Sequence, residues 1–109
     1  MSIPNLDPFQ VIADPCRRQI LELLTKDTSN IKSMVQNFEI SRPAISKHIK
    51  ILERSKFISI KKVGRERQCS LNQNGFEELK DWIVQFDSFW NSRLKNLEHV
   101  LNKKVSNNY

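Results

Sequence analysis

The chain has 109 residues, of which 39% are hydrophobic and only two are glycines, which suits one mainly helical domain and argues against an all-β or collagen-like protein. Its formal net charge is +6, and the region from Ser41 to Gln68 alone carries nine basic and two acidic residues. Because the rest of the chain is close to neutral, the distribution predicts one basic face for a polyanion rather than a generally basic surface.

Two aspartate-proline pairs mark the starts of short helices near the N-terminus. Asp7-Pro8 and Asp14-Pro15 each place an N-cap residue before a proline, and the helices that follow are predicted over about 8–13 and 15–26. In the second helix the apolar period predicts that Ile20, Leu23 and Leu24 face inward. It predicts that Arg17, Arg18 and Glu22 point mostly outward.

A helix-turn-helix is predicted next. Apolar spacing favours a helix over about 31–37, capped by Ser29 or Asn30, and a further helix over 41–54. Because only residues 38–40 separate these helices, they form the tight unit with which many proteins place a second, recognition helix in the DNA major groove.

At 100° per residue, segment 41–54 has two different faces. The apolar face is expected to pack on a core and contains Ala44, Ile45, His48, Ile49, Ile51 and Leu52. The opposite face is basic and rich in hydrogen-bond donors and contains Arg42, Pro43, Ser46, Lys47, Lys50 and Arg54. Since His48 lies on the apolar side, we expect a histidine at the edge of the core, bonded to backbone, rather than a ligand.

The stretch 57–71 predicts a β-hairpin with a basic tip. Ile58 and Ile60 alternate with polar residues, Gly64 marks the turn, and the chain returns to Leu71. The hairpin adds four cations to the basic region: Lys61, Lys62, Arg65 and Arg67.

A long helix is predicted over 74–103, because no proline interrupts it and apolar residues recur along one stripe. At 1.5 Å per residue it measures ~45 Å, more than a body of about 70 residues can cover. We expect the stripe to form a homodimer interface; the alternative is a helix folded wholly back on its own core. A polar, frayed tail is expected over 104–109. The predicted interface residues are Phe76, Leu79, Trp82, Ile83, Phe86, Phe89, Trp90, Leu94, Leu97 and Leu101.

The N-terminal sequence lacks the basic and apolar regions of a secretion signal, and no stretch reaches the ~18–20 apolar residues of a membrane span. A cytoplasmic protein without membrane contact is therefore expected. Its two cysteines, Cys16 and Cys69, are expected to be small buried hydrophobes rather than a disulfide framework.

Several motifs resemble the ArsR/SmtB family of small bacterial repressors. Residues 13–18 (ADPCRR) are similar to its A-D-P-x-R-R start, residues 41–49 (SRPAISKHI) to its recognition-helix signature, and residues 64–65 to its wing. Residues 89–97 are similar to a metal-independent branch that includes SdpR-like autorepressors. The resemblance implies a winged helix-turn-helix fold: a mainly α chain of about five helices with a two-stranded hairpin wing, homodimeric through its terminal helices.

The resemblance also places the basic face of 41–54 in the major groove and the wing on the adjacent backbone or minor groove. Two positions depart from the family, because Glu39 and Lys56 stand where glycine often provides a left-handed backbone. The residues expected to contact DNA are Arg42, Pro43, Ser46, Lys47, Lys50, Arg54, Lys61, Lys62, Arg65 and Arg67.

Alternative functions have weaker support in the sequence. The helix at 31–37 has no Cys or His for a family-type metal site and His99 has no partner at metal-binding spacing, so no metal or cofactor is expected. No catalytic constellation is recognisable, and an enzyme is not expected. A metal- or thiol-responsive repressor of the same fold and a protein-interaction module without DNA binding stay open as alternatives. The favoured interpretation is a dimeric repressor, with autorepression as one option, that binds a pseudo-palindromic double-stranded DNA operator with half-sites ~10 bp apart or a multiple of that distance.

Overall fold

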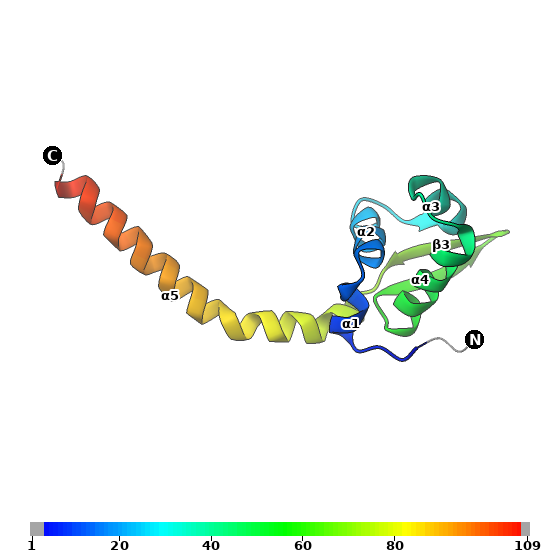
Figure 1. Ribbon diagram of the computed structural model, residues 1–109, viewed down its shortest axis with the longest axis horizontal. Coiled ribbons are helices and arrows are strands. Elements are labelled where there is room, and N and C mark those ends of the chain that lie inside the picture. The colour runs from blue at the N-terminus through cyan, green and yellow to red at the C-terminus, as the bar shows by residue number, and fades with distance from the viewer. Residues whose placement is uncertain (1–3, 108–109) are drawn as a thin grey trace. The chain divides into compact units, whose positions relative to one another are not determined.

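The computed structural model describes residues 4–107, with side chains up to residue 102, and forms two compact units (Figure 1). The first unit, Met1–Leu79, contains the helix-turn-helix and the hairpin, and the second, Lys80–Tyr109, contains most of the long last helix. In chain order the elements are α1 (Pro8–Ala13), α2 (Pro15–Leu24), β1 (Ser29–Asn30), α3 (Ile31–Asn37), α4 (Arg42–Arg54), β2 (Ile58–Val63), β3 (Glu66–Leu71), the 3-10 helix η1 (Gln73–Phe76) and α5 (Glu77–Asn107).

Each of the four short helices begins at a side-chain cap. The side chains of Asp7, Asp14 and Asn30 accept the backbone N–H of the residue three positions later at 2.9, 2.9 and 2.7 Å. Ser41 Oγ accepts the Ala44 N–H at 3.3 Å. These caps satisfy amides that have no partner within their helix, and they confirm the predicted helix starts.

The core of the first unit is formed by apolar side chains from every helix and from the hairpin. In α4 the apolar positions predicted to face inward are buried or half-buried, so the two-faced wheel of segment 41–54 is confirmed. The buried hydrophobic residues are Val11, Ile20, Leu21, Leu24, Met34, Ile45, Ile49, Ile51, Leu52, Phe57, Ile58, Cys69 and Leu79.

The wing is part of a three-stranded antiparallel sheet with strand order β1-β3-β2. Strands β2 and β3 form the predicted hairpin, with Ile58 opposite Leu71 and Val63 opposite Glu66. Strand β1 was not predicted; it pairs Ser29 with Cys69. A strand of two residues is too short to show an alternating pattern, so only its partner strand reveals it.

The C-terminus of α4 turns through Lys56, which adopts a left-handed backbone with φ of 64°. The N–H of Phe57 donates to the carbonyl of Leu52 at 2.9 Å and that of Lys56 donates to the carbonyl of Glu53 at 3.0 Å, the pair of bonds that closes a helix in a Schellman motif. Lys56 therefore accepts the conformation for which glycine is usual. Glu39 does not adopt this conformation, because Lys56 is the only non-glycine residue with positive φ in the part of the chain that is described.

Gly75 in η1 lies against this turn. Its N–H donates to the Lys56 carbonyl at 2.7 Å, and a Cβ added to Gly75 would lie 2.7 Å from the Phe57 nitrogen. The chain therefore needs glycine at this position because two backbone segments touch, and not because of its φ angle.

Two predicted helix ends differ from the structure. Helix α2 ends at Leu24 rather than near Lys26, and α5 continues to Asn107 rather than ending near residue 103. The start of α5 also differs, because it begins at Glu77, after the 3-10 helix η1, rather than near residue 74. The predicted tail over 104–109 therefore overlaps the helix as far as Asn107, and its last two positions lie outside the described residues. None of the described helices is long and apolar enough to span a membrane.

Candidate nucleic-acid interface

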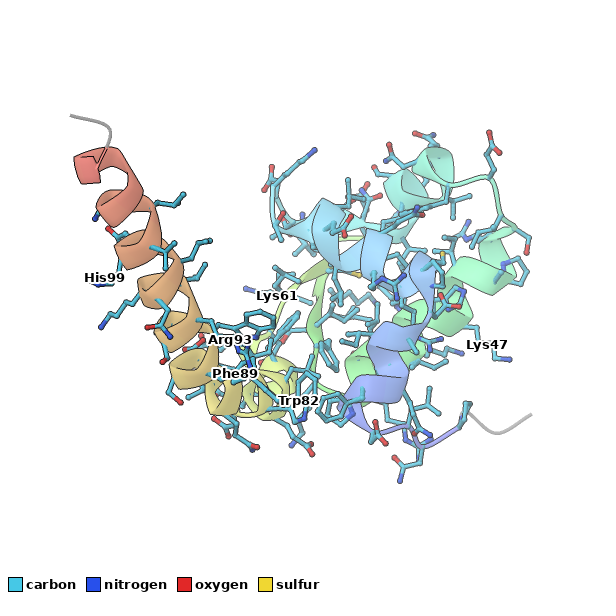
Figure 2. All side chains as sticks on the ribbon, turned by 60° about the vertical axis from the view of Figure 1, so that its left-hand side comes forward. Lys47, Lys61, Trp82, Phe89, Arg93 and His99 are labelled. Carbon is cyan, nitrogen blue, oxygen red and sulfur yellow. The ribbon has the colours of Figure 1, made fainter. Side chains whose placement is uncertain are left out.

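The polar face of α4 is presented to solvent. Arg42 is the first residue of the helix, and Pro43 in the first turn costs no helical hydrogen bond because that amide would have no partner. Lys47 extends away from the body of the first unit (Figure 2). Of the six predicted contact residues on α4, five are exposed and Ser46 is half-buried: Arg42, Pro43, Lys47, Lys50 and Arg54 are the exposed ones.

The hairpin presents the four cations predicted for the wing, all of them exposed: Lys61, Lys62, Arg65 and Arg67. Lys62 on β2 lies directly opposite Arg67 on β3. Like charges at directly opposed positions destabilise a sheet unless an anion lies near them. The pairing therefore places two positive charges side by side on the hairpin.

A small surface cavity, here called the notch, lies between α3, the start of α4 and the hairpin. Its lining residues come from α3 and the residue before it, from the first residue of α4, and from the turn and first residues of β3; its volume is about 240 Å³. The structure thus brings Arg42, Arg65 and Arg67 together, and it adds Lys32, which sequence reasoning missed. A single exposed lysine in a short helix has no pattern that would have identified it. The notch is lined by Asn30, Ile31, Lys32, Arg42, Arg65, Glu66 and Arg67.

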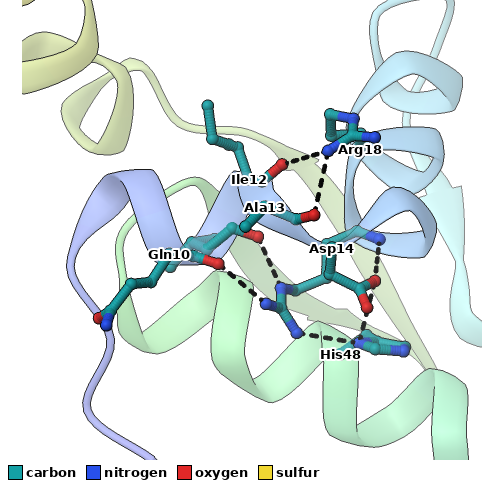
Figure 3. A network of polar contacts seen from close by, with 8 residues as sticks. Gln10, Ile12, Ala13, Asp14, Arg18 and His48 are labelled. Carbon is teal, nitrogen blue, oxygen red and sulfur yellow. Dashed lines mark hydrogen bonds and ion pairs between the residues drawn. The ribbon is translucent and has the colours of Figure 1, made fainter.

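Two arginines that were predicted to point mostly outward instead bind the C-terminus of α1 (Figure 3). Arg17 donates from Nε to the Val11 carbonyl at 2.7 Å and from a terminal nitrogen to the Gln10 carbonyl at 3.1 Å. Arg18 donates to the Ile12 and Ala13 carbonyls at 2.7 and 3.2 Å. The prediction was wrong for Arg17, which is buried, because the wheel of α2 contains no information about the four unpaired carbonyls of α1.

Arg17 also connects this network to the recognition helix. Its remaining terminal nitrogen lies 3.3 Å from His48 Nδ1, and an Asp14 carboxylate oxygen lies 3.9 Å from the same atom. His48 is at the edge of the core as predicted, but its partners are side chains rather than backbone. Partial burial lowers the pKa of His48; Asp14 opposes this shift, and Arg17 adds to it. A neutral ring with Nδ1 as acceptor for Arg17 fits this geometry.

Asp14, Cys16 and His48 bring three potential metal-ligand atoms within 4.8 Å of one another, the only such group found among the described residues. Arg17 lies against this group, with its guanidinium held by two α1 carbonyls and a terminal nitrogen 3.3 Å from His48 Nδ1. A fixed positive charge at that place opposes a metal cation. The group therefore fits a hydrogen-bonded cap better than a metal centre.

The two cysteines are reduced, and both favour the thiol form. Burial, with a smaller contribution from Glu53, raises the pKa of Cys69 to about 11. Partial burial and Asp14 raise the pKa of Cys16, against the opposing effect of Arg17. Since the thiolate is the reactive form, a raised pKa at both cysteines disfavours a redox-sensing role.

The predicted interface residues of the last helix fall into two groups. Phe76 and Leu79 pack in the core of the first unit, with the Phe76 ring 4.7 Å from that of Phe57. The other eight side chains are 41–59% exposed: Trp82, Ile83, Phe86, Phe89, Trp90, Leu94, Leu97 and Leu101.

Within the second unit, aromatic rings follow one another along the apolar stripe. The Phe89 ring lies 5.3 Å from that of Trp90, and Arg93 stacks its guanidinium 4.3 Å above the Phe89 ring (Figure 2). A cation over an aromatic face is attracted by the ring quadrupole, so the charged Arg93 side chain packs on the apolar Phe89 ring. His99, also on this helix, is exposed.

Known proteins resemble this chain in both sequence and fold. Residues 14–59 match the family described as bacterial regulatory protein, arsR family. The transcriptional repressor SdpR of Bacillus subtilis (strain 168) is 35% identical over 78 residues, which cover 72% of this chain and 87% of SdpR.

Two solved structures resemble the chain. A crystal structure of an ArsR family transcriptional regulator has a TM-score of 0.68 and 32% identity, over 78% of this chain and 88% of the other. A homodimeric winged helix-turn-helix DNA-binding domain from Mycobacterium bovis, described as a possible ArsR-family regulator, has a TM-score of 0.59 and 13% identity, over 73% and 77% of the two chains. The chain is thus a winged helix-turn-helix protein of the ArsR family of bacterial regulatory proteins, and it is a DNA-binding transcriptional regulator.

Proposed function

We propose that the protein is a homodimeric repressor that binds a pseudo-palindromic operator. The observation that supports this most directly is the exposed basic face of α4, which is continuous with the cationic hairpin through the notch. The name of SdpR, a transcriptional repressor, supports repression as the outcome. In this proposal the bound dimer represses by occluding a promoter. Such a regulator would act in the cytoplasm by binding, and its similarity to transcriptional regulators favours binding over catalysis.

In this proposal the contact residues have different tasks. Arg42 donates two hydrogen bonds to guanine O6 and N7, Ser46 contacts a base or phosphate, and Pro43 contacts a thymine methyl. The remaining residues hold the DNA backbone and contribute affinity that falls with salt: Lys47, Lys50, Arg54, Lys61, Lys62, Arg65 and Arg67.

Dimerisation through α5 is the second part of the proposal. Exposed aromatic side chains along several turns of one helix are unfavourable in a monomer, and a second copy offers the same stripe to cover them. The homodimeric Mycobacterium bovis structure of the same fold supports this assembly. Two recognition helices would then enter successive major grooves.

The test is fluorescence anisotropy on a duplex selected from genomic fragments, including the chain's own upstream region. We expect the triple variant Arg42→Ala, Ser46→Ala, Lys47→Ala to weaken operator binding by about tenfold or more, since a bidentate base contact contributes ~1–3 kcal/mol. The matched control is Lys26→Ala, Lys80→Ala, which removes the same charge from exposed positions outside the proposed face. Equal affinity of the triple variant and the wild type would refute the assigned reading face.

The alternatives predict other outcomes of the same assay. An interaction module without DNA binding predicts no steep decline of affinity with salt. A metal-responsive repressor predicts that zinc lowers operator affinity, and a thiol switch predicts a loss on oxidation that the Cys16→Ser, Cys69→Ser variant resists.

A further inference from the structure

The notch between the helix-turn-helix and the hairpin gathers positive charge from three separate elements. Lys32 comes from α3, Arg42 from the start of α4, and Arg65 and Arg67 from the hairpin. Its volume of about 240 Å³ accommodates a group several times larger than a water molecule, which occupies ~30 Å³ in the liquid.

The four cations are available to an outside ligand. All four side chains are exposed, and none forms an ion pair with any residue whose side chain the structure describes. The notch has one carboxylate, that of Glu66, whose Oε2 accepts a hydrogen bond from Asn30 Nδ2 at 3.2 Å. Four cations against this one carboxylate leave a net positive charge around the cavity, which attracts an anion.

Asn30 links the two sides of the notch. Its Oδ1 caps α3 by accepting the Ser33 N–H at 2.7 Å, and its Nδ2 donates to Glu66 at the first residue of β3. The Asn30 backbone also pairs with Gln68 in the sheet. One residue therefore holds the hairpin against the helix-turn-helix, and with it the spacing of the cations.

We propose that this notch binds one backbone phosphate of the operator DNA, with Lys32 as an additional phosphate contact and Asn30 as its positioning residue. The inference depends on the proposed DNA-binding function and deepens it. A phosphate is favoured over a base because four of the seven lining residues are cationic and only two, Glu66 and Asn30, have side chains that can accept hydrogen bonds. Arg42 lines the notch and also begins the polar face of α4. While its guanidinium reads the guanine, the neighbouring backbone phosphate lies at the notch, where Lys32, Arg65 and Arg67 hold it.

Lys32→Ala is the first test. Loss of one phosphate contact in each protomer of the dimer is expected to weaken specific and nonspecific duplexes equally, by about threefold or more, and to reduce the slope of log affinity against log salt by about 1.8. Lys26→Ala, an exposed lysine on a different part of the surface, is the matched control and is expected to change neither quantity. An unchanged salt slope in Lys32→Ala would overturn the proposal.

The second test exchanges donor and acceptor across the notch. Asn30→Asp keeps the α3 cap but loses the donor to Glu66 and opposes two carboxylates, so it is expected to weaken DNA binding by about threefold or more. Adding Glu66→Gln supplies a donor to Asp at position 30 and restores the charge of the wild-type notch, and affinity is expected to return. A double variant as weak as Asn30→Asp alone would exclude Asn30 as a positioning residue.

These tests separate failure of the notch from failure of the proposed function. If the triple variant of the α4 face loses binding while Lys32→Ala does not, the chain reads DNA without using the notch. If the wild type shows no salt-dependent affinity for any duplex, both proposals fail. Replacing chloride by inorganic phosphate at constant ionic strength is expected to leave DNA affinity within about twofold; strong competition that Lys32→Ala abolishes would assign the notch to free phosphate instead.

Discussion

At the scale of single residues, the basic side chains of the first unit divide into those with partners inside the fold and those without. Arg17 and Arg18 donate to the carbonyls at the end of α1, whereas Lys32, Arg42, Arg65 and Arg67 surround a cavity without ion pairs to described side chains. Sequence position does not separate the two kinds, because the helical period assigns Arg17 and Arg42 alike to the polar side of their helices. Only the partner groups identify the second kind as available for DNA.

His48 gives a residue-scale prediction. Burial lowers its pKa in the folded chain below the usual value of 6.5, so between the two pKa values the unfolded chain binds the proton more readily. The contribution of neutral His48 to the free energy of unfolding is therefore complete above pH 6.5, and it is lost as the pH falls through the pKa of His48 in the folded chain. We expect the free energy of unfolding of the wild type to fall more between pH 7.5 and 5 than that of His48→Asn, whose amide oxygen can replace Nδ1 as the acceptor for Arg17.

Urea denaturation at both pH values measures this difference. His48→Asn is the informative variant because it removes the titration while it keeps the hydrogen bond. The same fall in both proteins would show that the ring titrates as it does in the unfolded chain.

At the scale of elements, local signals identified some features of the fold and missed others. The helix starts at Asp7, Asp14 and Ser41 were predictable because a cap acts on amides three residues away. Strand β1 was not, because it exists only through its pairing with β3. The notch depends on Asn30 and Glu66, which are 36 positions apart, and no local pattern relates such residues.

The end of α4 gives the element-scale prediction. Lys56 holds a left-handed backbone, which costs an L-residue ~1–2 kcal/mol and costs glycine little. We therefore expect Lys56→Gly to stabilise the protein by about 1 kcal/mol in thermal or urea denaturation. Lys56→Ala, which removes the side-chain charge but keeps the strain, is the control and should not be stabilised; equal gains in both variants would trace the effect to charge instead.

At the scale of the whole molecule, the stripe of α5 was visible in the sequence, but its division between two roles was not. The apolar period runs from Phe76 to Leu101 without a break, while Phe76 and Leu79 belong to the core of the first unit. A helical wheel gives the direction of a side chain. It contains no information about whether the residues that bury this side chain come from the same chain or from a partner. The proposed interface therefore begins at Trp82.

Assembly is the whole-molecule prediction. Trp90→Lys introduces a charge into the proposed interface, so we expect a shift from dimer to monomer in sedimentation equilibrium and a loss of operator affinity toward that of a single half-site. Asn91→Lys adds the same charge at the neighbouring exposed position and should remain dimeric. Circular dichroism of both variants checks that the helix is retained, and a dimeric Trp90→Lys protein would remove α5 as the interface.

The contact between Gly75 and the turn at Lys56 restricts the substitutions that this chain can accumulate. At position 56 several residues besides glycine are tolerable, since the cost is a backbone angle that unbranched side chains such as that of Lys56 can adopt. At position 75 every other residue places the same Cβ atom against the Lys56 and Phe57 backbone, so a smaller or more polar replacement gains nothing over a larger one. Replacing this glycine therefore requires that the segment before α5 also move away from the turn at Lys56. An insertion or deletion between the hairpin and α5 would likewise have to preserve the close contact between these two backbone segments.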